Sequence, residues 1–215
     1  MPRNRSVEDK LRAEYFELLA DIRLAVLETE TRVRSHLLGV SLNLKQYERL
    51  LVTSRVKECN SAVDALRRRQ PFGIFDEDRP DDYSLTQLRD LAGIRVMAFP
   101  RQRIDDAHAA LLEILSLWTA DPVPGVDGAS VPLARKYFGT WTPHTRITAE
   151  IQIVGLLIGS FWEVEHSAIY KPDPNLRGVV ESEKVMQPRN DVLAALQAFE
   201  LAFEEAVSNR DTRRS

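Results

Sequence analysis

The sequence has little cysteine and no long hydrophobic run, and both shortages narrow the class of protein. Cys59 is the only cysteine among 215 residues, so an internal disulfide framework and a cysteine-ligated zinc site are both excluded. The apolar segment IQIVGLLIGSFW is too short to cross a membrane, and the first ten residues are polar. We therefore expect a cytoplasmic protein without a membrane anchor.

A strong charge imbalance is also missing. The net charge is −3 and the isoelectric point is about 5.9, which argues against a generally basic nucleic-acid-binding surface but allows a local basic cleft. The sequence contains no internal repeat or low-complexity tract. With 44% hydrophobic and 28% charged residues, the chain is typical of a globular protein that has one sizeable core and an appended helix.

Helical periodicity dominates the first third of the chain. Apolar residues recur at three- and four-residue steps from Leu11 to Leu37, which predicts a long amphipathic helix. Ser6, followed three residues later by Asp9, resembles a capping box at its start. The segment from about Leu42 to Arg69 lacks glycine and proline, so we predict a second helix that ends before Pro71.

Two segments alternate with period two and predict strands. AGIRVMAF, residues 92–99, is the first, and RITAEIQIV, residues 146–154, is the second. In the second segment one face is apolar and the other carries polar groups, namely Arg146, Thr148, Glu150 and Gln152. The predicted fold class is therefore α/β, with a mixed sheet flanked by helices.

Three further helices are predicted in the second half of the chain. They cover residues 104–117, residues 156–170 and a segment from about Asn190, a good helix cap, to Phe203. Residues 70–84 and 119–132 are rich in proline, glycine and aspartate and are predicted to be irregular loops. Strands therefore alternate with helices along one compact unit.

The polar faces of the two predicted strands carry the chemistry. One strand offers Arg95, with Asp90 just before it, and the other offers Glu150. Two carboxylates near cations suit Mg²⁺, which often combines one or two carboxylates with substrate phosphates. Upstream, Arg55 and Lys57 supply the positive charge that a triphosphate needs. On periodicity alone, an ordinary solvent-exposed strand face explains the same residues better.

Four segments, in order along the chain, together resemble a known family. They are RVKECNSAVDALRRR, LRDLAGIRVMAF, AEIQI and FWEVEHSAIYK, and they resemble the synthetase domain of the RelA/SpoT family, which makes the alarmones ppGpp and pppGpp. The matching segments span residues 50–172, more than half the chain. The resemblance implies a nucleotidyltransferase-like synthetase domain at residues 42–180, between an N-terminal helical extension at 1–41 and a C-terminal helix and tail at 181–215.

The resemblance also implies an activity and a set of site residues. Family synthetases are pyrophosphokinases that transfer the β,γ-pyrophosphate of ATP to the 3′-hydroxyl of GDP or GTP with Mg²⁺. The matching catalytic residues are Asp90, Glu150 and Gln152, of which Asp90 and Glu150 would also bind the metal. The matching ATP-binding residues are Arg55, Lys57, Ser61, Arg67 and Arg95. Structural or substrate-supporting roles fall to Glu165, His166, Tyr170 and Lys171, although His166 is more simply explained as a structural histidine that orients its helix.

The acceptor-binding region differs from the family pattern. Family synthetases carry a Gly-Tyr-x-Ser-x-His loop whose tyrosine stacks on guanine, whereas this chain reads ARKYFGTWTPHTR. Its aromatic candidates for acceptor binding are Tyr137, Trp141 and His144. The family strand also ends Glu-x-Gln-x-Arg-Thr, whereas here Val154 and Gly155 take the last two places.

These differences leave other functions open. One alternative is a toxin that pyrophosphorylates the 3′ end of tRNA, which basic residues such as Arg135, Lys136 and Arg146 would hold. A second is a catalytically degenerate member that binds nucleotide or a partner as a regulator. Because none of the four histidines is followed by aspartate, the hydrolase activity of the family is not expected.

The apolar stripe of the first predicted helix also leaves two roles open. It either forms a face for a homo-oligomer, as the flanking helices of small family members do, or packs within the chain.

Overall fold

A five-stranded mixed sheet forms the centre of the computed structural model, which describes residues 6–124, 132–141, 145–165, 179 and 182–212. The strands lie in the order β1-β2-β5-β4-β3, with β2 and β5 parallel and the other neighbours antiparallel. Their bounds are β1 Arg49–Val56, β2 Ala92–Phe99, β3 Thr119–Ala120, β4 Ala134–Gly139 and β5 Ala149–Gly155. The predicted fold class is confirmed.

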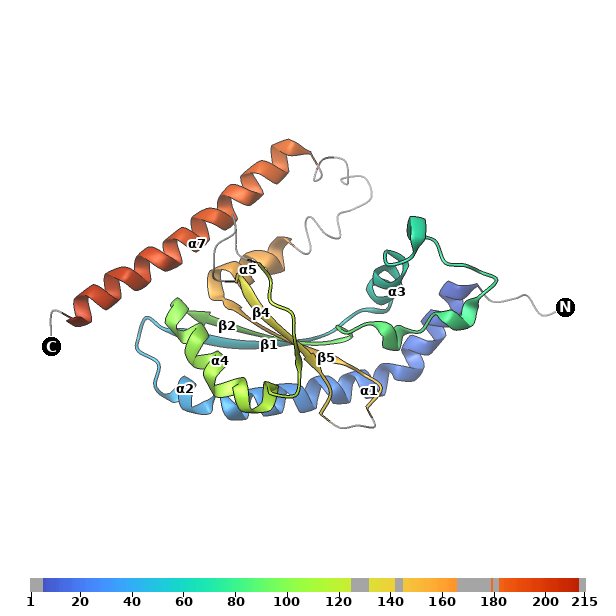
Figure 1. The fold of residues 1–215 in the computed structure, drawn as a ribbon, viewed down its shortest axis with the longest axis horizontal. Coiled ribbons are helices and arrows are strands. Elements are labelled where there is room, and N and C mark those ends of the chain that lie inside the picture. The colour runs from blue at the N-terminus through green and yellow to red at the C-terminus, as the bar shows by residue number, and fades with distance from the viewer. Residues whose placement is uncertain (1–5, 125–131, 142–144, 166–178, 180–181, 213–215) are drawn as a thin grey trace.

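Helices cover both faces of this sheet. Figure 1 shows α1 and α4 along one face, and α5 and α7 on the other. The helices are α1 Val7–His36, α2 Leu38–Leu42, α3 Cys59–Arg67, α4 Arg101–Leu115, α5 Leu156–Glu165 and α7 Glu183–Thr212, and short 3-10 turns cover Pro71–Gly73, Pro80–Asp82 and Leu85–Gln87. No helix in the described parts of the chain is long and apolar enough to cross a membrane.

The main core lies between the sheet and helices α1 and α4. Period-two alternation places Ile94, Ile151 and Ile153 on this face, where all three are buried. The buried stripe of α1 that packs into the same cluster comprises Leu11, Tyr15, Leu18, Ile22, Val33 and Leu37. The intramolecular role predicted for this stripe is therefore confirmed, whereas a homo-oligomer through the terminal helices stays a prediction.

A second apolar cluster fastens α5 and α7 to the opposite face. Met97 and Val154 come from the ends of the two parallel strands, Ile158 from α5 and Leu193 from α7. A Cβ atom added at Gly159 would lie 2.8 Å from the sulfur of Met97, so α5 packs very close to the sheet. The apolar contacts occupy the C-terminal ends of β2 and β5 and leave the N-terminal ends to polar residues.

Several predicted elements are confirmed. The side chain of Ser6 accepts a hydrogen bond from the Asp9 amide at 3.2 Å and caps α1. Strand β2 covers the predicted residues 92–99, and β5 ends at Gly155.

Three predictions of local structure are wrong. Residues 49–56 form strand β1 rather than part of a helix, because LLVTSRV pairs along its whole length with β2, and α3 begins only at Cys59. Residues 134–139 form β4, where the sequence analysis predicted no strand. Helix α7 begins seven residues before Asn190 and includes Pro188, a residue that usually ends a helix.

The main core gives a direct test of this packing. Replacing the fully buried Ile151 with alanine should lower the free energy of unfolding by roughly 2 to 5 kcal/mol, because the variant loses apolar contacts and leaves a cavity. Leu117, which is 96% exposed, provides the control, and its change to alanine should cost less than about 0.5 kcal/mol. Urea denaturation followed by circular dichroism would measure both, and equal losses would contradict the assigned core.

Candidate functional site

Strand register brings polar residues from distant parts of the sequence into two adjacent rows. Arg55 of β1 lies opposite Gly93 of β2, which lies opposite Glu150 of β5. The neighbouring row contains Thr53, Arg95, Gln152 and Lys136. Because members of the two rows are separated by two residues on each strand, both rows point to the face that α5 partly covers.

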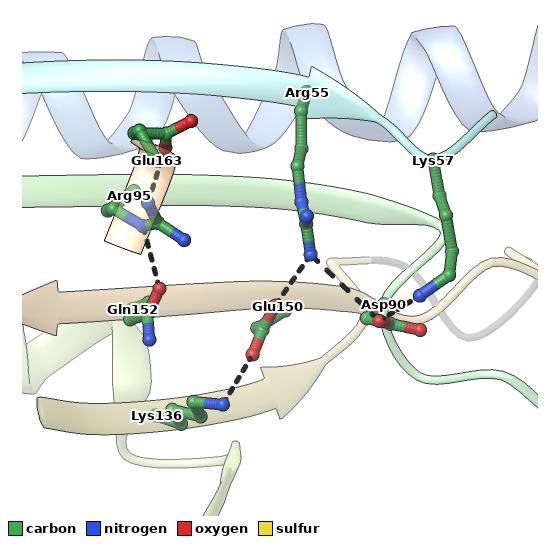
Figure 2. A network of polar contacts seen from close by, with 8 residues as sticks. All are labelled: Arg55, Lys57, Asp90, Arg95, Lys136, Glu150, Gln152 and Glu163. Atoms are coloured by element: carbon green, nitrogen blue, oxygen red, sulfur yellow. Dashed lines mark hydrogen bonds and ion pairs between the residues drawn. The ribbon is translucent and has the colours of Figure 1, made fainter. Parts of the chain in front are cut away.

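Arg55 connects the two predicted catalytic carboxylates. Its side chain extends across β2, and the guanidinium lies 3.8 Å from Glu150 Oε2 and 3.9 Å from Asp90 Oδ2 (Figure 2). A Cβ atom at Gly93 would lie 3.1 Å from Arg55 Nε, so a larger residue there would require the Arg55 side chain to shift. The predicted pairing of Asp90 and Glu150 at one place is therefore found, with a cation between them.

Asp90 also pairs with Lys57 at the entrance to β2. Burial opposes ionisation of Asp90, but the Lys57 ammonium and Arg55 outweigh it and hold the pKa of this carboxyl below its usual value. Burial lowers the pKa of Lys57, and Asp90 opposes that shift. The second carboxylate oxygen of Asp90, Oδ1, is buried and has no hydrogen-bond partner among the described residues, so one oxygen is left to bind something else.

Arg95 lies one row further along the same face. Its Nε donates to Gln152 Oε1 at 2.8 Å, and its guanidinium pairs with Glu163 of α5 (Figure 2). Burial lowers the pKa of Arg95, and Glu163 opposes that shift. These groups line a cavity of about 350 Å³. The other residues that line it are Thr53, Ser54, Arg55, Gly93, Ile94 and Glu150.

Strand β4 contributes two site residues, of which the sequence analysis missed Phe138 and named Lys136 only as a basic residue that would hold an alternative acceptor. Lys136 Nζ lies 3.6 Å from Glu150 Oε1, on the side of Glu150 away from Arg55 (Figure 2). Phe138 lies opposite Glu150 in the strand register, and the Arg89 guanidinium is 5.7 Å from the centre of its ring. The alternation in ARKYFG could have indicated a strand with Lys136 and Phe138 on one face. No strand was predicted there, so these side chains were not assigned to a face of the sheet.

Two of the aromatic residues predicted to bind the acceptor lie elsewhere. Tyr137 points to the opposite face of the sheet, where its hydroxyl lies 2.6 Å from Nε2 of His108 on α4. The indole nitrogen of Trp141 donates to the hydroxyl of Thr29 on α1 at 2.7 Å. His144, His166, Tyr170 and Lys171 lie outside the described residues.

The other predicted site residues take different positions. Ser61 lies in the first turn of α3, just after Lys57. Arg67 points to α1, where it pairs with Glu8 at 3.0 Å. Glu165 is buried and accepts a hydrogen bond from Arg189 of α7 at 2.6 Å. Arg67 and Glu165 therefore pair with residues of other helices rather than with Asp90 or Glu150.

No family model and no curated protein matches this sequence, but solved structures do. The small alarmone synthetase 1 from Bacillus subtilis aligns with a TM-score of 0.65 at 19% identity, covering 93% of this chain and 99% of that one. This chain has the small alarmone synthetase fold. The same protein bound to its product pppGpp aligns at 0.66 and 20% identity, covering 92% and 98% of the two chains. A GTP pyrophosphokinase family protein from Streptococcus pneumoniae aligns at 0.56 and 20%, covering 90% and 96%.

The alarmone synthetase fold confirms the predicted resemblance at the level of architecture. The alignments cover more than nine-tenths of this chain and of the synthetase 1 chains, so the likeness is not limited to the central sheet. The roles of individual residues rest on the geometry of this site.

The depressed pKa of Asp90 gives a prediction for stability. Its ionised form stabilises the folded state above the unfolded pKa of 3.8, and this contribution is lost as the pH falls through the lower folded value. Asp90→Asn should therefore lower the unfolding free energy by roughly 1 to 3 kcal/mol at pH 7, and the difference should shrink towards pH 3.

Chemical denaturation at several pH values between 7 and 3 would measure this difference. Asp81→Asn is the control, because the Asp81 side chain is 97% exposed and its ion pair contributes little. A deficit for Asp90→Asn that stayed constant down to pH 3 would show that ionisation of Asp90 does not stabilise the fold.

Proposed function

We propose that this protein is a pyrophosphokinase that transfers the β,γ-pyrophosphate of ATP to the 3′-hydroxyl of GDP, GTP or a related acceptor. The observation that carries this proposal is the pair of carboxylates, Asp90 and Glu150, held around Arg55 on one sheet face. Both are charged groups in a partly buried site, and cations adjoin each of them. A site that only bound a nucleotide would have no need of two acids among its phosphate-binding cations.

The donor phosphates fit the β1 side of the site. Arg55 and Lys57 supply two cations there, and α3 begins two residues after Lys57 with Ser61 in its first turn. Backbone amides at a helix N-terminus favour phosphate groups, and guanidinium groups bind them in a bidentate manner. An arriving triphosphate would compete with Asp90 and Glu150 for these cations, so both carboxylates would be released towards the substrate.

Mg²⁺ fits the carboxylate pair that this release provides. The unpartnered Oδ1 of Asp90 is a buried acceptor, and Glu150 supplies the second carboxylate. The described residues contain no cluster of three or more acidic, histidine or cysteine ligands, so substrate phosphates and water would complete the coordination, as is common for Mg²⁺. When bound, the ion would neutralise charge on the triphosphate.

In this proposal, Glu150 accepts the proton of the acceptor hydroxyl. In the transfer, a bond forms between the 3′-oxygen and the β-phosphorus, the bond from that phosphorus to the α-phosphate oxygen breaks, and AMP leaves. The hydroxyl proton passes to Glu150. Arg55 and Lys136 adjoin its two oxygens and offset the cost of burying the ionised carboxylate. Catalysis of this kind depends mainly on positioning and on charge neutralisation.

The acceptor fits the β4 side of Glu150. The attacking hydroxyl must face the β-phosphorus directly and lie within hydrogen-bond reach of the base, and the donor cations Arg55 and Lys57 lie on the β1 side of Glu150. The opposite side carries Lys136 and Phe138, with Arg89 over the aromatic ring. A cation beside an aromatic ring suits a nucleotide, because purines stack on aromatic faces and phosphates attract cations. We therefore assign the base platform to Phe138 in place of Tyr137 and Trp141.

The transfer itself is the first test. Purified protein incubated with Mg²⁺ and γ-labelled ATP should label GDP or GTP, and Glu150→Gln should abolish the labelled product because the base is removed while its shape is kept. Bulk tRNA belongs in a parallel reaction, since label on tRNA would instead indicate an RNA-modifying toxin. If folded protein still binds ATP but transfers label to none of the acceptors, the result would contradict the enzyme and support a nucleotide-binding regulator.

The acceptor platform has its own test. Phe138→Leu should raise the KM for the acceptor roughly tenfold through lost stacking, while the KM for ATP stays unchanged. Phe138→Tyr should restore the acceptor KM because the ring is kept. The competing assignment is tested by Tyr137→Leu, and a larger effect of that variant on the acceptor KM would place the acceptor on the tyrosine instead.

A further inference from the structure

Helix α7 is joined to both ends of α5 by polar contacts. Near the end of α5, the buried carboxylate of Glu165 pairs with Arg189. At its start, the Leu157 amide donates to Glu200 Oε1 at 3.4 Å. These two contacts are made by residues eleven positions apart on α7, so the helix lies along α5 from one end to the other (Figure 1).

Apolar contacts accompany the polar ones. Leu193, between Arg189 and Glu200, packs into the cluster formed by the sheet and α5. Further along α7, Phe203 lies 4.9 Å from Phe99 at the end of β2, measured between ring centres. The helix therefore rests on the sheet as well as on α5.

Glu200 is an unusual group for such a contact. Only 4% of its surface is exposed, and it adjoins a water-sized cavity of about 30 Å³. A Cβ atom at Gly155 would lie 2.5 Å from its Oε2, so the glycine that ends β5 makes room for this carboxyl. The charged groups that face it are Arg101 and Asp105 of α4, Arg135 of β4 and Glu204 of α7.

These groups do not give Glu200 a dedicated cation. Arg135 pairs with Asp105 at 2.7 Å, which largely cancels both charges. Arg101 favours the ionised form of Glu200 and Glu204 disfavours it. A buried carboxyl with such surroundings is held in place more readily when it carries a proton.

The position of α5 matters for the candidate site. Between its two anchored ends, α5 carries Glu163, which pairs directly with Arg95 in the lining of the 350 Å³ cavity. The same helix lies so close to the sheet that Gly159 leaves no space for a Cβ atom. Any movement of α5 would therefore change the position of Glu163 and, with it, the orientation of the Arg95 guanidinium.

We propose that α7 is a pH-sensitive clamp that holds α5 against the sheet, and that ionisation of the buried Glu200 loosens it. The clamp sets the position of Glu163 and Arg95, and its effect on ligand binding rests on the proposed nucleotide site. The clamp itself is independent of that function, because the contacts between the helices and the sheet define it.

The direction of the pH dependence follows from the surroundings of Glu200. Burial raises its pKa from 4.5 to about 7, the Leu157 amide and Arg101 oppose this shift, and Glu204 adds to it. Docking of α7 is then strongest below pH 4.5, weakens as the pH rises through 7 and becomes constant above it. Between pH 6 and pH 8.5 these values weaken docking about tenfold.

Hydrogen–deuterium exchange of the full chain tests the clamp. After correction for the intrinsic pH dependence of exchange, amides of α5 and residues 183–206 should exchange about tenfold faster at pH 8.5 than at pH 6. Amides of β2 and β5 provide the internal reference and should not change. Glu200→Gln keeps the shape and the hydrogen-bond acceptor, so it should remove the difference between the two pH values.

Two further variants make the outcome decisive. Glu205→Gln, an exposed position on the same helix, should keep the wild-type pH dependence. Gly155→Ala should displace the Glu200 carboxyl and give fast exchange at both pH values. Equal pH dependence in wild type and Glu200→Gln would overturn the clamp, as would equal exchange rates at the two pH values in wild type.

Binding of a non-hydrolysable ATP analogue separates the clamp from the proposed function. A wild-type affinity that falls from pH 6 to pH 8.5 while that of Glu200→Gln is unchanged would connect the clamp to the site. Failure of the analogue to bind at either pH would count against the proposed function alone, because the exchange experiment would still decide the clamp.

Discussion

Charge burial on one face of the sheet is the constraint on which the rest of the structure depends. Glu150 and Gln152 lie inside an otherwise apolar strand and are only 8% and 7% exposed, a position that carboxylates and amides occupy only with partners. The partners come from three other strands, because Arg55 of β1, Lys136 of β4 and Arg95 of β2 reach them across the sheet. Pairing of β1, β2, β5 and β4 in this one alignment is therefore required for the charges to be tolerated at all.

The sequence was most informative where a side-chain pattern reports directly on the environment. Alternation predicted β2 and β5 because one face of each is buried in the main core, and the motif residues Asp90 and Glu150 met as expected. Strand β1 could not be recognised in the same way, since it lies at the sheet edge and its burial alternates only weakly. Because residues 49–56 were assigned to a helix, the sequence analysis could not predict that Arg55 reaches Glu150 across β2.

The acceptor side shows a second limit of sequence reasoning. Whether Tyr137 or Phe138 faces Glu150 depends on a single step in strand register, and no residue-type preference decides it. Pairing with β5 puts Lys136 and Phe138 on the site face, and His108 engages Tyr137 on the other. Likewise, the replacement of the family's strand ending by Val154 and Gly155 had no visible reason in the sequence, whereas the structure fills that space with α5 and α7.

The place of β1 at the sheet edge has a consequence for solubility. Edge strands expose unpaired backbone groups that can recruit other chains, and charged side chains prevent such association. Arg34 donates to the backbone carbonyl of Val52 at 2.7 Å, which occupies one of the exposed acceptors, and Arg55 keeps a charge near the end of the strand. The contact from α1 therefore removes one backbone acceptor of β1 from pairing with another chain, while the Arg55 side chain turns inward across β2 to Glu150.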